Sequence, residues 1–183
     1  GIGMPGKVLC SAYDSTHHLL YVGGYFTYAD GQEMNSIACY DGTKWYPVGG
    51  GLTYYYYYLA WVEQMAVVNG VLYVSGIFDK AGTTNCFIGF ASWDGEQWSP
   101  VPFIPGFKVT NLFAFENKLF IGAYKESTGN TATSIYSWNG SLLENAAAGV
   151  GGAGTSSAKL NFGIHHGQLF VSGIFLNMRL GKW

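Results

Sequence analysis

Charged side chains are scarce in this sequence. Asp, Glu, Lys and Arg make up 11% of its 183 residues, and the net charge is −2. Ordinary globular domains carry about 25% charged residues, so a surface this poor in charge is unusual for a soluble monomer. We therefore expect much of the surface to contact sister subunits, a matrix or glycan. The sequence has no cluster of Lys and Arg, which speaks against a nucleic-acid partner.

Long apolar runs and paired cysteines are missing as well. No window is long enough to span a bilayer as a helix, so we expect no membrane-spanning segment. Cys10, Cys39 and Cys86 lack the spacing of a metal finger, and their odd number allows at most one disulfide within the chain. The sequence begins at Gly1 without an initiator Met or a signal peptide, which suggests a processed or partial chain.

A repeated phrase is the strongest feature of the sequence. It begins with a leucine at positions 20, 72, 119 and 169, about every 50 residues. The copies are Leu20–Phe26, Leu72–Phe78, Leu119–Tyr124 and Leu169–Phe175. Each copy is short and rich in aromatic and β-branched residues, which is typical of a β-strand. No helical periodicity competes with this pattern, so the sequence predicts an all-β protein.

A second phrase follows the first three copies and ends in a turn signal. It covers Ile37–Gly42, Phe90–Gly95 and Ile135–Gly140. Each copy closes with Asp-Gly or Asn-Gly, the dipeptides that supply positive φ for tight hairpins. Three residues after the glycine stand Trp45, Trp98 and, in the third copy, Leu143. Together the two phrases predict consecutive antiparallel strands.

The period predicts a β-propeller of four-stranded antiparallel blades, because a repeat near 50 residues corresponds to one blade. For the first blade we expect strands at 7–13, 19–26, 36–40 and 44–48. We interpret residues 1–183 as one domain with blades at about 1–50, 51–105 and 106–152, and a partial fourth blade at 153–183.

The two phrases together resemble the repeats of the kelch and galactose-oxidase superfamily of propellers. They look closest to the LYVGG-F repeats of secreted bacterial proteins and of fungal cell-surface polarity markers. The residues that carry this resemblance, and that we expect to shape the blades, are Gly23, Gly24, Tyr40, Trp45, Gly76, Trp93, Trp98 and Gly173. The resemblance implies an extracellular or cell-surface location. The ligand motifs of galactose oxidase find no match here, so its copper chemistry is not carried over.

Three full repeats and a fragment fall short of the roughly 4–8 blades that close a propeller. The N-terminal strand and the tail could complete a fourth blade within this chain. Alternatively, the sequence is part of a longer chain, or blades from several chains share a ring or stack. The partial and the assembled arrangements are the ones we favour.

The most unusual local feature is a run of five tyrosines, Tyr54 to Tyr58, followed by Trp61. In an extended chain alternate side chains face opposite sides. We identify Tyr54, Tyr56, Tyr58 and Trp61 as interface or ligand candidates, because exposed Tyr and Trp are favoured at binding hot spots. Core packing and stacking on sugar rings are the alternatives.

The remaining motifs have structural explanations. Asn139-Gly140-Ser141 is a candidate N-glycosylation site, but it also fits the hairpin turn of the repeat. Residues 149–154 spell G-x-G-x-x-G without the helix that a nucleotide site needs. We predict no catalytic, metal or cofactor site. The hypothesis is a non-catalytic propeller module that binds other protein chains or its own copies. A carbohydrate-binding propeller is the alternative, and an enzyme with a central-channel site is the third.

Overall fold

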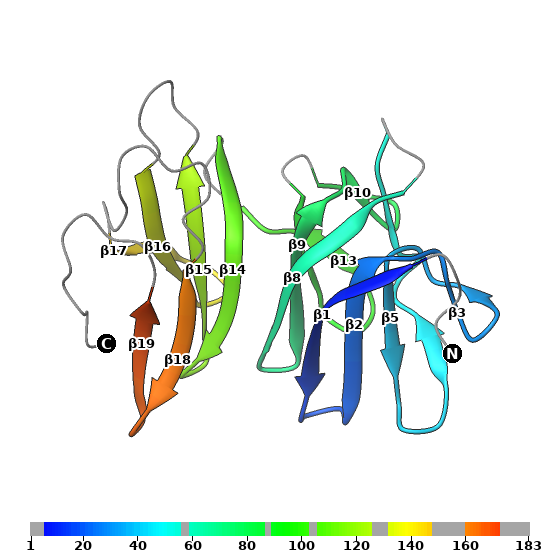
Figure 1. Cartoon of the computed structure of the whole chain (residues 1–183), viewed down its shortest axis with the longest axis horizontal. Coiled ribbons are helices and arrows are strands. Elements are labelled where there is room, and N and C mark those ends of the chain that lie inside the picture. The colour runs from blue at the N-terminus through cyan, green and yellow to red at the C-terminus, as the bar shows by residue number, and fades with distance from the viewer. Residues whose placement is uncertain are drawn as a thin grey trace. The chain divides into compact units, whose positions relative to one another are not determined.

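The computed structural model describes residues 6–55, 59–86, 89–102, 106–125, 132–147 and 160–172. Within these ranges 66% of the residues are in strands and none is in a helix, so the predicted all-β class is confirmed. The chain divides into two compact units, Gly1–Phe103 and Ile104–Trp183. We describe each unit by itself (Figure 1).

The first unit contains two four-stranded antiparallel sheets. The first sheet has the order β1 (Lys7–Asp14), β2 (Leu19–Tyr25), β5 (Ile37–Tyr40), β6 (Trp45–Pro47). The second has the same order of strands, β8 (Trp61–Val68), β9 (Val71–Ile77), β12 (Phe90–Trp93), β13 (Trp98–Pro100). The four strands expected in the first repeat are thus confirmed, each end within one residue of its predicted position.

Short strands lie in the connections between the long ones, β7 (Leu52–Thr53) between the two sheets and the others between the two central strands of a sheet. The others are β3 (Tyr28–Ala29), β4 (Gln32–Glu33), β10 (Lys80–Ala81) and β11 (Thr84–Asn85). β3 pairs with β4, and β10 pairs with both β11 and β7. The sequence had suggested only loops here, because segments of two residues carry no readable alternation.

The second unit contains a third four-stranded sheet and a hairpin. The third sheet has the order β14 (Phe107–Phe115), β15 (Lys118–Lys125), β16 (Ala132–Trp138), β17 (Leu143–Ala147). The hairpin consists of β18 (Asn161–His165) and β19 (Gln168–Ser172). All pairings in the unit are antiparallel between neighbours in the chain.

The first strand of each four-stranded sheet carries a bulge at the same place. The register shifts between Val8 and Cys10, between Val62 and Gln64, and between Val109 and Asn111. A Cβ on Gly24 would collide with the carbonyl oxygen of Lys7, and one on Gly76 with that of Trp61. In the first two sheets the close approach at the bulge explains the last glycine of the phrase, whereas the third sheet has Ala123 at the equivalent position.

The hairpins that close the second phrase are built alike. The side-chain Oδ1 of Asp41 accepts hydrogen bonds from the amides two and three residues on, at 2.7 and 2.9 Å. Asp94 does the same at 2.9 and 2.8 Å, and Asn139 at 3.0 and 2.8 Å. The following glycines have φ of 98°, 103° and 99°. The predicted turns are confirmed, and Asn139 has a structural role in one of them.

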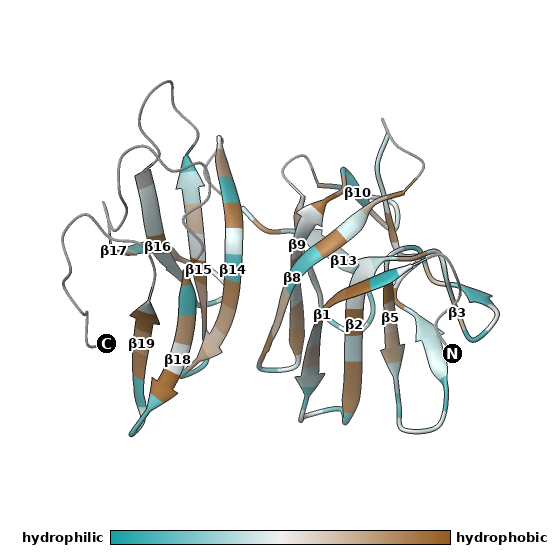
Figure 2. Ribbon diagram, in the orientation of Figure 1, coloured by the Kyte–Doolittle hydropathy of each residue, from teal (hydrophilic) through white to brown (hydrophobic). Residues whose placement is uncertain are grey.

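Each sheet has two faces, which we name after the first two residues of the repeated phrase. The leucine face carries Leu20, Leu72, Leu119 or Leu169, and the aromatic face carries the next residue, Tyr21, Tyr73, Phe120 or Phe170. Successive residues of a strand point to opposite faces. Figure 2 shows hydrophobic residues along the central strands that carry the phrase.

The larger core cluster of the first unit lies between its two sheets, and a smaller one, with Phe26 and Met34, covers Val22 and Ala38 on the leucine face of the first sheet. The aromatic face of the first sheet, with Tyr21 and Ile37, packs on the leucine face of the second, with Leu72 and Val74. In the second unit, Phe120 of the third sheet likewise packs with Leu169 of the hairpin. The Phe113 and Phe162 rings stack at 5.7 Å in that contact. In both units, an aromatic face covers a leucine face.

Candidate functional site

The predicted aromatic segment is divided between core and surface. Tyr54 is half-buried and packs against the core of the first unit, whereas the Tyr55 side chain is 86% exposed. The Tyr55 amide donates to Asp79 Oδ2 at 2.9 Å, which holds the backbone at the start of the run. Tyr56 and Tyr58 lie outside the described residues. The alternation expected of an extended chain is thus present at its first two tyrosines.

Trp61 is partly exposed at the edge of the contact between the two sheets of the first unit. It stands at the start of β8, half-buried, with its ring 6.3 Å from that of Tyr25. Its Nε1 donates to Glu63 Oε1 at 3.1 Å. Trp61 therefore joins the two sheets, and Tyr55, which the sequence reasoning did not single out, is the exposed aromatic of this region.

The residues expected to shape the blades do contact one another. The Tyr40 and Trp45 rings lie 5.0 Å apart, and those of Trp93 and Trp98 lie 5.3 Å apart. A Cβ on Gly23 would stand 2.5 Å from Met65 Cε, so this glycine lets the second sheet approach the first. Gly173 lies outside the described residues.

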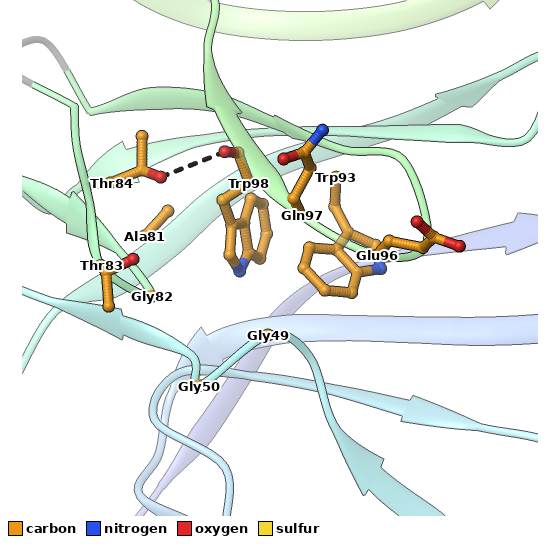
Figure 3. Close-up of a pocket in the computed structure, with 10 residues that line it drawn as sticks. All are labelled: Gly49, Gly50, Ala81, Gly82, Thr83, Thr84, Trp93, Glu96, Gln97 and Trp98. Carbon is orange, nitrogen blue, oxygen red and sulfur yellow. Dashed lines mark hydrogen bonds between the residues drawn. The ribbon is translucent and has the colours of Figure 1, made fainter.

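The Trp93–Trp98 pair forms one wall of an open pocket of about 480 Å³ in the first unit (Figure 3). Its lining consists of Gly49, Gly50, Ala81, Gly82, Thr83, Thr84, Trp93, Glu96, Gln97 and Trp98. Two bonds fix the Trp98 side of the pocket. The ring Nε1 donates to Val48 O at 3.3 Å, and Thr84 Oγ1 donates to Trp98 O at 3.1 Å. The sequence reasoning missed this pocket because its walls come from two different repeats.

The pocket combines an aromatic wall with a few polar groups. Figure 3 shows the two indole rings side by side, with Glu96 beside Trp93 and Thr83 on the side of Trp98. Flat rings, hydroxyls, an amide and a carboxylate suit a sugar, which offers C–H faces and hydroxyl groups. Among the described residues that line the pocket, Glu96 is the one carboxylate.

A second pocket, of about 390 Å³, lies in the second unit. Its lining consists of Phe115, Glu116, Lys118, Phe120, Ser137, Glu144, Asn145 and Ala146. Lys118 Nζ stands 4.0 Å from Glu144 Oε2 across exposed surface. An exposed pair of this kind contributes little to stability, and the pocket offers a ligand fewer fixed groups than the Trp93–Trp98 pocket does.

The β1 edge of the first sheet exposes apolar side chains, although Val22 and Ala38 at the middle of its leucine face are buried. Val8, Leu9 and Tyr13 of β1 are 45%, 51% and 58% exposed. Tyr40 and Trp45 on the same sheet are half-buried. On the second sheet, by contrast, Val62 takes the place of Val8 and Trp98 that of Trp45, and both are buried. The first sheet thus presents apolar side chains that its neighbour hides.

Burial lowers the reactivity of the three cysteine thiols. Burial raises the pKa of Cys10 to about 12 and also raises the pKa values of Cys39 and Cys86. All three cysteines are free thiols. Thiols with raised pKa stay protonated at neutral pH and are poor nucleophiles.

Asp14 has a structural partner at the turn after β1. Burial works to raise the pKa of this carboxyl, but hydrogen bonds from the His17 ring and from the Thr16 and His17 amides outweigh it and lower the pKa. His17 Nδ1 lies 2.6 Å from Asp14 Oδ2. In the described part of the chain no group of three or more His, Cys, Asp or Glu residues is arranged to hold a metal ion.

Neither the known protein-family models nor the curated proteins include a match to this chain. The kelch-like resemblance therefore rests on the repeated phrases and stays a prediction. The described residues form no helix of the length and apolar character that crossing a membrane requires.

Proposed function

We propose that this chain is a non-catalytic, kelch-like propeller module that acts by associating with protein surfaces, including copies of itself. Its four-stranded sheets would serve as the blades. Three features support this interpretation: the shared strand order, the bulge in the first strand, and the side-chain-capped turn after the third strand. The stacking of an aromatic face on a leucine face is how neighbouring blades would pack.

The observation that carries the proposal of association is the exposed leucine face of the first sheet. Contiguous apolar side chains on a surface mark interaction sites more often than isolated ones do. Val8, Leu9 and Tyr13 lie on one strand, and Tyr13 pairs across β2 and β5 with Leu20 and Tyr40. The scarcity of charge across the whole chain, 11%, favours the same conclusion.

Light scattering of the purified chain over a range of concentrations tests the proposal. We expect a mass above the 19.9 kDa of one chain that rises with concentration. A mass of one chain at every concentration would contradict self-association. We place the protein outside the cell or at the cell surface, as the family resemblance implies.

The Trp93–Trp98 pocket supports a second candidate function, saccharide binding. Glu96 and Gln97 border the pocket, and both side chains are exposed. The variants Glu96→Gln and Gln97→Ala should therefore fold normally. We expect both changes to weaken binding of any saccharide found in a glycan array. Tyr28→Ala is the control, because Tyr28 is 48% exposed, lies outside the leucine-face row and lines no part of this pocket. An array without any binding would remove this candidate.

A further inference from the structure

The faces of the sheets follow a single packing rule within each unit. Tyr21 of the first sheet packs in one cluster with Leu72 of the second, and Phe120 of the third sheet packs in another with Leu169 of the hairpin. The same two positions of the repeated phrase therefore meet twice in the chain. An aromatic face and a leucine face are complementary surfaces.

Two faces of the chain are less buried than the equivalent faces of the other sheets. Of the four leucines that begin the phrase, Leu72, Leu119 and Leu169 are buried, and Leu20 is only half-buried. Of the four aromatic residues that follow, Tyr21, Tyr73 and Phe120 are buried, and Phe170 is only half-buried. Among the described residues, one surface of each complementary kind is thus only partly covered.

The leucine face of the first sheet is apolar and partly open. One row across the sheet consists of Tyr13, Leu20, Tyr40 and Trp45, since residues paired across strands share a face. In the next row Val22 and Ala38 are already buried by Phe26, Ala29 and Met34 of the same unit. The open row contains no charged side chain, so a partner could cover it without burying an unpaired charge.

The aromatic face of the β18–β19 hairpin is smaller, and its described residues include no carboxylate and no lysine or arginine. Phe170 pairs with Gly163, and Gln168 pairs with His165. The Phe170 and His165 rings lie 6.0 Å apart, edge to face, and His165 is exposed. This pair of rings occupies the position that Tyr21 and its neighbours occupy on the first sheet.

We infer that the aromatic face of the hairpin in one copy docks on the leucine face of the first sheet in a second copy. This inference rests on the proposed self-association and names the two surfaces that make it. The contact joins different surfaces of the two copies, so it either closes into a ring or continues as an open chain of copies. It repeats between chains the packing already present within each unit.

Two variants, each altered on one of the two faces, test whether the hairpin of one copy contacts the first sheet of another. Tyr13→Lys places a charge on the leucine face at a side chain that is 58% exposed, and Phe170→Lys places one on the hairpin. We expect each variant alone to associate at least about 100-fold more weakly, because docking would bury an unpaired charge. Mixed together, they should form a one-to-one dimer of about 40 kDa, twice the mass of one chain, through the intact face of each.

Tyr28→Lys is the matched control, because this tyrosine is 48% exposed and lies in the β3–β4 hairpin, outside both rows of the leucine face. It should associate like the unaltered chain. Val8→Lys and Gln168→Lys serve as second variants of the two surfaces, since Val8 pairs with Gly24 on the leucine face and is 45% exposed, and circular dichroism checks that each variant is folded.

The outcomes separate this inference from the proposed function. A multimer that survives both Tyr13→Lys and Phe170→Lys would overturn the named surfaces and leave self-association standing. Failure of the two folded variants to form the mixed dimer would overturn the head-to-tail direction. An unaltered chain that stays monomeric at every concentration would overturn the inference and the proposed self-association together.

Discussion

The first and second sheets of the first unit share one pattern and differ in burial. Both carry the same bulge, the same strand order and the same capped turn. Leu72 and Trp98 of the second sheet are nonetheless buried, whereas Leu20 and Trp45 of the first are half-buried. Backbone geometry therefore follows from residues close in sequence, while burial depends on which sheet lies against a face.

Truncating equivalent leucines should give the largest effect and test this comparison directly. We expect Leu72→Ala to lower the free energy of unfolding by about 2–5 kcal/mol, as for other buried leucines. Leu20→Ala should cost less than half as much in the monomer, since part of its side chain already contacts water. Urea unfolding at low protein concentration measures both. Equal losses would show that the two leucine faces are covered alike.

A methyl group at the bulge glycines should give the next largest effect. In Gly76→Ala the new Cβ would collide with the Trp61 carbonyl oxygen, so we expect a loss of about 1–3 kcal/mol from overpacking. The control is Gly163→Ala, because no atom lies within 4 Å of a Cβ placed there. Thermal unfolding of the two variants provides the measurement. An unchanged melting temperature for Gly76→Ala would mean that the bulge can relax, as Ala123 at the equivalent site of the third sheet allows.

Acid should destabilise the first sheet through Asp14, because the equivalent turn of the second sheet has no carboxylate. The pKa of Asp14 is lowered in the folded protein, so its stabilisation is complete above the unfolded pKa near 3.9. It is lost as the pH falls through the lower folded pKa. The second sheet has Asn69-Gly70 in its turn instead. We expect Asp14→Asn to reduce stability at pH 7 and to flatten its decline below about pH 4, as followed by urea unfolding. A parallel decline in variant and unaltered chain would exclude this role.

Thiol labelling gives the smallest perturbation and reports on the covered face of the first sheet. Cys10 and Cys39 pack against the core between the sheets, and burial raises the pKa of Cys10 to about 12. We expect all three cysteines to react slowly with a thiol reagent at pH 8 and rapidly after unfolding. Fast labelling of Cys10 in the folded chain would mean that the first sheet separates readily from the second.

Much of the fold was predictable because its signals are local. The Asp41 and Asp94 turns and the long strands depend on residues within a few positions of one another. The β7–β10 pairing was not predictable, because Leu52–Thr53 pairs with residues nearly thirty positions later and carries no alternation. For the same reason the sequence identified the tyrosine run, but it did not show that Tyr54 packs inward or that Trp93 and Trp98 line a pocket with Gly49 of the preceding repeat.

That pairing also bears on how the chain acquires its structure. Within each sheet every long strand pairs with its neighbours in the chain, an arrangement of short loops that favours rapid folding. β7 is the exception, since it belongs to the connection leaving the first sheet yet completes a small sheet beside the second. We therefore expect the second sheet to gain its full stability only once the first is in place, so that order of synthesis and order of folding run in the same direction.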